Sequence, residues 1–318
     1  MDLLLALSAV AVGLALLTVG ADRLIDAAVA IARRLRLPEA VIGATIVAGG
    51  TSMPELVASL SGALVGQYGL AVGNVVGSNS FNIGVILGLV ALIAPLHVAP
   101  AIARFDWPIM AVVSIACCAI ALGFGVFPLW ACVSFLAIWL GYITWSVRSG
   151  HGAEEAAAPV DAMSPTKMAL WLVAGIALLT CGGWLLVWGS VELARSAGIS
   201  DAIIGLTIVA AGTSAPELVT SLMAAKRGQH QIAVANIIGS NTFNILLILG
   251  VTGLFGTLPV ADEIVRRDLW WMLGFSLLLP LAWGCGRLVI GRLAGGMLLA
   301  GYLFYLAILI RGVIARGI

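Results

Sequence analysis

One stretch of about forty residues occurs twice in this chain and constrains its fold more than any other feature. The first copy runs from Gly43 to Asn82 and the second from Gly205 to Asn244. Each residue of the first copy aligns, without a gap, with the residue 162 positions later, and 25 of the 40 pairs are identical. Such similarity predicts two structural units that follow the same local rules.

The apolar content of the chain excludes a soluble fold. Of 318 residues, 62% are hydrophobic and only 10% are charged, and the mean hydropathy is +1.13. A soluble domain of this length could not bury so much apolar surface, so we expect an all-α polytopic membrane protein. Polar residues, glycines and prolines divide the chain into ten candidate spans, at about 3–31, 39–65, 70–94, 107–123, 128–147, 168–195, 201–225, 231–256, 268–284 and 289–310.

A charged linker divides these ten helices into two sets of five. Residues 151–167 carry two prolines and three acids, and they separate a first repeat (1–150) from a second (168–318). The register of 162 residues continues outside the core copies, where Arg104 and Asp106 match Arg266 and Asp268. Because each half has an odd number of spans, the second must be upside down relative to the first, which predicts an inverted repeat.

The positive charges in the connections predict the orientation. One set of connections contains ten Lys and Arg residues and the opposite set contains five. Lys and Arg accumulate on the cytoplasmic side of a membrane. We therefore expect a multi-pass protein of the cell (inner) membrane, with the linker in the cytoplasm and both termini outside.

Two carboxylates lie near the centre of apolar spans. They are Glu55 and Glu217, which occupy the same position in the two copies. An ionisable group at the bilayer centre costs about 3 kcal/mol, so it normally has a partner or a function. No Lys or Arg occurs in either copy before Lys226, which makes an ordinary buried ion pair improbable. A bound cation is the simplest remaining charge partner.

A proline interrupts each of these two helices next to the carboxylate. Pro54 and Pro216 lack an N–H and displace the carbonyl four residues earlier, at Gly50 and Gly212. Irregular backbone at membrane depth is tolerated where it lines a polar cavity. Carbonyl and carboxylate oxygens are the ligands that hard cations such as Na⁺ and Ca²⁺ prefer. The break therefore favours a cation site.

Hydroxyl and amide side chains accompany each carboxylate. Helical spacing places Thr51 and Ser52 on the same face as Glu55, and the same pattern recurs in the second copy. No His or Cys belongs to the set, which argues against zinc or copper. The side chains that share this repeated pattern are Thr51, Ser52, Ser78 and Asn82 in the first copy, and Thr213, Ser214, Ser240 and Asn244 in the second.

These motifs resemble those of a known transporter family. GTSMPEL with GSNSFN, and GTSAPEL with GSNTFN, are similar to the two α-repeats of the cation/Ca²⁺ exchanger superfamily, and most similar to its prokaryotic sodium/calcium exchanger branch. The resemblance implies Ca²⁺ extrusion driven by Na⁺, with alternating access to ions held between the repeats. By position, it implies ion ligands from Glu55, Glu217, the eight hydroxyl and amide residues above, and the backbone carbonyls of Ala48 and Ala210.

Position 82 and its repeat 244 limit the charge of the site. Potassium-dependent relatives carry Asp at one of these places, whereas this chain has Asn at both. The site thus has two negative charges, which favours exchange independent of K⁺. Antiport of H⁺ against Ca²⁺ or another divalent cation remains an alternative, because the same carboxylates can bind protons.

Other classes of function fit less well. An intramembrane hydrolase would need paired aspartates, and neither core copy contains Asp; a channel would not need a closed, duplicated carboxylate site. We therefore expect no enzyme activity, no cofactor, and no nucleic-acid or protein partner beyond the ions and the lipid bilayer. The first and sixth helices are rich in glycine, which predicts either mobile gating elements or close helix packing.

Overall fold

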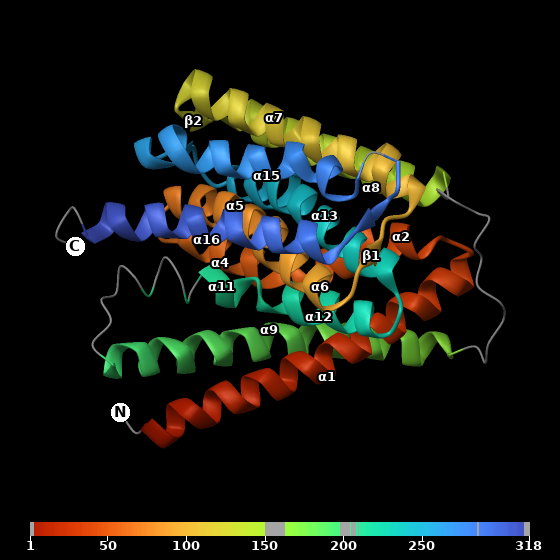
Figure 1. Cartoon of the computed structure of the whole chain (residues 1–318). Helices are drawn as coiled ribbons and strands as arrows, with labels where there is room; N and C mark the ends of the chain where they lie inside the picture. The colour runs from red at the N-terminus through yellow and green to blue at the C-terminus, as the bar shows by residue number, and fades with distance from the viewer. Residues whose placement is uncertain are drawn as a thin grey trace.

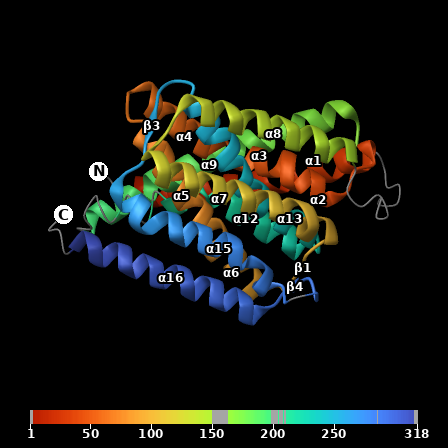
Figure 2. The ribbon, with the colours of Figure 1, turned by 90° about the horizontal axis from the view of Figure 1, so that it is seen from above.

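A computed structural model describes residues 3–149, 163–197, 204, 208, 210–284 and 286–314. Most of the predicted linker and both extreme termini lie outside the described residues. The protein is a bundle of long helices (Figure 1), and a view turned by 90° shows α16 and α15 on the opposite side of the bundle from α8 (Figure 2).

The first half contains helices and π-helical segments, which carry the label η. They are α1 (Leu3–Leu35), α2 (Glu39–Ile42), η1 (Gly43–Val47), α3 (Ala48–Thr51), α4 (Met53–Leu64), α5 (Gly69–Phe81), η2 (Asn82–Leu87), α6 (Gly88–Ile93), η3 (Ile102–Asp106), α7 (Trp107–Phe124) and α8 (Leu129–Ser149).

The second half repeats this order. Its elements are α9 (Pro165–Ser196), α11 (Ala210–Thr213), α12 (Ala215–Lys226), α13 (His230–Phe243), η6 (Asn244–Ile248), α14 (Leu249–Thr252), η7 (Ile264–Asp268), α15 (Leu269–Ala282) and α16 (Arg292–Ile314). The start of α1 and the end of α16 lie at one end of the bundle, whereas α8 ends and α9 begins at the other end (Figure 1).

The described residues include seven helices that are long and apolar enough to cross a membrane, or eight if one bent pair counts as a single span. The sequence predicts ten. The predicted span 201–225 falls partly outside the described residues, and α15, at 14 residues, is shorter than the predicted span 268–284. The membrane character of the chain is thus evident from these helices, and the full count of ten stays a prediction.

The bent pair is the helix of the first copy that Pro54 was predicted to interrupt. The segments Glu39–Thr51 and Met53–Leu64 meet at an angle of 45°. Ser52 lies between them, and Pro54 occupies the first turn of α4, where a missing N–H costs nothing. Pro216 has the same place in α12, after Ser214. The predicted break is present in both copies.

Two short β-ribbons, which an all-α prediction misses, join the halves. Strand β1 (Leu96–His97) pairs antiparallel with β4 (Val289–Ile290), and β2 (Val126–Phe127) pairs with β3 (Leu258–Pro259). Each ribbon therefore takes one strand from each half. Strands this short between apolar helices leave little sequence signal, because two residues cannot show an alternating pattern.

The glycine-rich helices α1 and α9 pack closely side by side, below the rest of the bundle in Figure 1. A Cβ built at Gly13 would lie 2.8 Å from the carbonyl oxygen of Gly182, and one built at Gly20 would lie 3.0 Å from that of Gly175. The order of these contacts shows that the two helices run antiparallel. Glycine is required at these positions because the two backbones touch.

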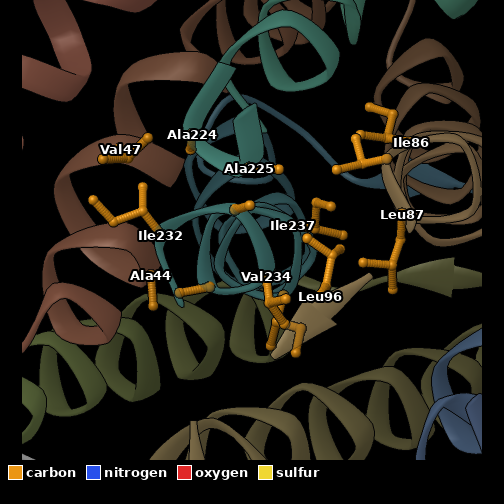
Figure 3. Close-up of a cluster of buried hydrophobic side chains, with 14 of the residues drawn as sticks. Ala44, Val47, Ile86, Leu87, Leu96, Ala224, Ala225, Ile232, Val234 and Ile237 are labelled. Atoms are coloured by element: carbon orange, nitrogen blue, oxygen red, sulfur yellow. The ribbon is translucent and has the colours of Figure 1, made fainter. Parts of the chain in front are cut away.

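An apolar cluster holds the site-bearing helices of both halves together (Figure 3). Its residues are buried, and η1, η2, α12 and α13 are among the elements that contribute to it. Among them are Ala44, Val47, Ile86, Leu87, Ala224, Ala225, Ile232 and Ile237. Because both halves contribute to one cluster, the broken helices of the two copies are held in a fixed relation to each other.

Acids near the ends of spans pair with arginine. Arg227, which directly follows α12, forms ion pairs with Asp22 and with Asp26 of α1, the latter at 2.9 Å. The matched residues Asp106 and Asp268 are buried, and each accepts a hydrogen bond from a tyrosine hydroxyl, at 2.8 and 3.0 Å. These contacts account for four carboxylates outside the core copies as structural groups.

Candidate cation site

The two core carboxylates lie in equivalent places, fully buried at the helix breaks. Glu55 is in the first turn of α4, and Glu217 is in the first turn of α12. The positive end of a helix dipole stabilises a negative charge there. Each break thus supplies a helix N-terminus in the middle of the protein, and each N-terminus holds one carboxylate.

Each carboxylate accepts a hydrogen bond from the serine of the other copy. Ser52 Oγ donates to Glu217 Oε1 at 2.8 Å, and Ser214 Oγ donates to Glu55 Oε1 at 3.1 Å. Helical spacing predicted that Ser52 lies on the same face as Glu55. This prediction is wrong for the Ser52 hydroxyl, which bonds to Glu217 instead. The helix breaks at Ser52 (φ −83°, ψ 8°), and its side chain turns toward the opposite copy.

The threonines and small residues of the broken segments line the same region. Thr51 and Ala48 are fully buried, and Thr51 Oγ1 lies 3.2 Å from both the Ala48 carbonyl oxygen and Asn236 Oδ1. The Ala48 carbonyl also accepts the Ser52 N–H at 3.0 Å, so it must release a bond before it can bind an ion. Thr213 is half-buried, and Ala210 begins α11.

Four asparagines interlock between the two copies. Asn82 Nδ2 donates to Asn241 Oδ1 at 2.9 Å, and Asn244 Nδ2 donates to Asn79 Oδ1 at 3.0 Å. Asn79 and Asn241 in turn donate to each other's backbone carbonyl oxygens, both at 3.1 Å. Asn82 and Asn244 also begin the π-helical segments η2 and η6, a distortion often found at functional sites.

Several buried oxygens of the predicted set have no hydrogen-bond partner among the described residues. They are one oxygen of each carboxylate, the amide oxygens of the two predicted asparagines and one serine hydroxyl: Glu55 Oε2, Glu217 Oε2, Asn82 Oδ1, Asn244 Oδ1 and Ser240 Oγ. Buried polar atoms normally have partners, so this group of acceptors indicates a ligand. Ser78, the remaining predicted residue, is buried on α5.

The chemistry of this set suits a hard cation. Among the ion pairs of the described residues, none involves Glu55 or Glu217. Within the same residues, no group of three or more His, Cys, Asp and Glu gathers as it would around a transition metal. Carboxylate, hydroxyl and amide oxygens are ligands typical of Na⁺ and Ca²⁺.

Some polar residues of the site are not among those that the sequence predicts. Asn79 and Asn241 are absent from the predicted set, as are Asn74 and Asn236, which donate to Ser59 and Ser221 at 2.9 Å. A signal was available, because all three pairs of positions (59 and 221, 74 and 236, 79 and 241) are identical in the two copies. Identity across the repeat therefore identifies supporting residues as well as ligands.

Comparison with known proteins places the chain in one family. The family model described as sodium/calcium exchanger protein matches residues 5–148 and 167–311. The putative antiporter CaxA of Alkalimonas amylolytica is 37% identical over 305 residues, which cover 93% of this chain and 96% of the relative. A sodium/calcium exchanger of Methanosarcina acetivorans is 33% identical, with 93% of this chain and 96% of the relative covered.

A solved structure supports the same assignment. The sodium-calcium exchanger NCX_Mj, in crystals soaked with Na⁺ and Ca²⁺, superposes with a TM-score of 0.82 at 33% identity, and the match covers 95% of this chain and 98% of that one. The duplicated helix breaks, the paired carboxylates and these likenesses lead to one conclusion. The chain belongs to the sodium/calcium exchanger family.

Proposed function

We propose that this protein is a secondary antiporter that exchanges Na⁺ for Ca²⁺ by alternating access at one site between the two repeats. The observation that carries the proposal is the set of unpartnered buried oxygens to which Glu55, Glu217 and three other residues of the duplicated motifs contribute. Both halves contribute to the group, and it contains two carboxylates. The Methanosarcina acetivorans relative and the solved structure are named as exchangers of sodium and calcium, which supports the choice of ions.

Charge neutrality explains how such a site couples the two ions. Two carboxylates are neutralised by one Ca²⁺ or by two Na⁺, and any further Na⁺ is held by neutral oxygens. A buried, uncompensated charge is expensive in a low dielectric, so only a neutralised site changes access readily. Because both ions need Glu55 and Glu217, they compete for one site, and one ion leaves as the other arrives.

We assign the ion ligands to the residues that the sequence predicts. Glu55 and Glu217 bind through their free oxygens, and Asn82, Asn244 and Ser240 also have free buried oxygens. Thr51, Ser52, Ser78, Thr213 and Ser214, with the carbonyls of Ala48 and Ala210, complete the proposed set. The absence of an aspartate at positions 82 and 244 makes the exchange independent of K⁺.

A flux assay tests the proposal. The purified protein is placed in liposomes loaded with Na⁺, and uptake of radioactive Ca²⁺ is measured after dilution into Na⁺-free buffer. We expect uptake that requires the Na⁺ gradient and is unchanged by K⁺. Uptake driven by a pH gradient without Na⁺ would instead identify H⁺/Ca²⁺ antiport. Flux without any counter-ion would identify a channel, and either result would overturn the proposal.

We further propose ten spans in two inverted halves, in the inner membrane, with the linker in the cytoplasm. The start of α1 and the end of α16 lie at the same end of the bundle, which is compatible with this topology. A reporter that is active only outside the cytoplasm tests the orientation. It should be active when fused after Ile318 and inactive when inserted between residues 151 and 167.

A further inference from the structure

The interlocked asparagines form a directed network whose two ends are free oxygens. Asn79, Asn82, Asn241 and Asn244 are all buried, with at most 1% of their surface exposed. Their hydrogen bonds cross between the two copies and are nearly symmetric, with lengths of 2.9 to 3.1 Å. No carboxylate, lysine or arginine takes part in these bonds.

Donor and acceptor chemistry determines the direction of every bond. A backbone carbonyl only accepts, so Asn79 must turn its NH₂ group to the Asn241 carbonyl oxygen, and this leaves Asn79 Oδ1 facing Asn244. Asn244 can satisfy that oxygen only with its own NH₂ group. Its Oδ1 is therefore turned away from the network, and it has no partner in the part of the chain that the structure describes.

The same argument holds in the other half. Asn241 donates to the Asn79 carbonyl oxygen, receives the NH₂ group of Asn82, and leaves Asn82 Oδ1 free. If the amide of Asn82 or Asn244 turned over, two oxygens would face each other inside the network. The NH₂ group would then also occupy the position that the free oxygen now holds, and its N–H bonds would repel a cation there.

We propose that Asn79 and Asn241 are positioning residues, which hold the side-chain oxygens of Asn244 and Asn82 toward the transported cation. This inference rests on the proposed ion site. It assigns a role to two residues that do not themselves bind the ion, and it explains why the oxygens, rather than the NH₂ groups, of the two ligand asparagines are presented.

A double-mutant cycle tests the role of Asn79. Asn79→Ala removes the acceptor that orients Asn244, and we expect the Ca²⁺ concentration for half-maximal exchange to rise about 2- to 10-fold, the effect of one lost hydrogen bond. The maximal rate should change little. A carboxylate presents an oxygen whichever way it turns and cannot donate to Asn79 Oδ1. In an Asn244→Asp background, Asn79→Ala should therefore raise this concentration less than about 2-fold, a coupling that independent sites do not show.

A second double-mutant cycle repeats the test in the other half. A serine variant and a binding assay distinguish loss of positioning from misfolding and from a wrong assignment of function. Asn241→Ala should show the same coupling with Asn82→Asp and none with Asn244→Asp. If an alanine variant does not fold, Asn79→Ser keeps a small buried acceptor and should recover most of the affinity. Stabilisation of the purified protein by Ca²⁺, measured as a shift in melting temperature, reports ion binding without transport.

The outcomes are separable. Equal effects of Asn79→Ala in both backgrounds, or no effect in either, would overturn the positioning role while wild-type Ca²⁺ binding remained intact. Failure of the proposed function would instead appear as wild-type protein that Ca²⁺ does not stabilise. Coupling restricted to the pairs 79 with 244 and 241 with 82 is the result that supports the inference.

Discussion

Replacing Gly182 with alanine should force helices α1 and α9 apart. A Cβ at this position would lie 2.8 Å from the carbonyl oxygen of Gly13, 2.8 Å from the Leu17 nitrogen and 3.0 Å from the Leu16 Cβ. The first two atoms belong to the backbone of α1 and cannot rotate away. The whole helix must therefore shift, and contacts along the antiparallel pair must loosen.

The size of the effect follows from two opposing contributions. Overpacking of this kind costs about 1–3 kcal/mol, whereas glycine to alanine in a helix gains about 1 kcal/mol. Gly141 in α8 provides the matched control, because a Cβ there meets no atom within 4 Å. Gly141→Ala shows the gain alone, so the difference between the two variants isolates the cost of the contact at Gly182.

The assay is thermal unfolding in detergent, followed by tryptophan fluorescence. The Tm of Gly182→Ala should lie below that of Gly141→Ala by on the order of 5 °C. Equal values, or a higher Tm for Gly182→Ala, would refute the reasoning. Flux per folded molecule separates the two interpretations of the glycine-rich helices: unchanged flux indicates a packing role, and flux reduced beyond the loss of folded protein indicates a moving contact.

Three further predictions concern the site and its link to α1. Glu55→Gln and Glu217→Gln keep an oxygen for the serine bond but lose a negative charge. Two unit charges 4 Å apart attract by about 4 kcal/mol at an effective dielectric constant of about 20, and Ca²⁺ carries two charges, so Ca²⁺ affinity should fall by more than about 1,000-fold in folded protein; near wild-type Ca²⁺ uptake would contradict the ligand assignment. Ser52→Ala removes a charge-assisted bond of 2.8 Å and should raise the half-saturating Ca²⁺ concentration about 10- to 100-fold, whereas Ser134→Ala, on an exposed helix face, should leave it unchanged. Arg227→Gln breaks half-exposed ion pairs with α1 and should lower the stability by less than about 1 kcal/mol; a larger fall in Tm at low salt would show that these pairs hold α1 to the core.

Local chemistry explains which parts of the site the sequence could predict. Pro54 and Pro216 break their helices for reasons that need no tertiary information, and both breaks are present in the structure. The burial of Glu55 and Glu217 was also predictable, because long apolar spans flank them. These features depend on the chain near each residue.

The remaining features depend on contacts between the two copies. The spacing of Ser52 and Glu55 suggested that they share one face, but Ser52 lies at the break and bonds to Glu217. The direction of the amide bonds around Asn79 is set by a backbone carbonyl 162 residues away. No pattern within a single copy contains that information, although the identity of Asn79 and Asn241 across the repeat marks them as important.

The two β-ribbons have a consequence for what one half of the chain could form alone. Each ribbon needs one strand from each half, and each core carboxylate needs a serine from the other half. A single half would therefore expose unpaired strand edges and an incomplete ion site. Two identical, separate copies of one half could form the same contacts only as a symmetric dimer. In the duplicated chain both partners are always present in one molecule, and the two halves are free to differ in sequence.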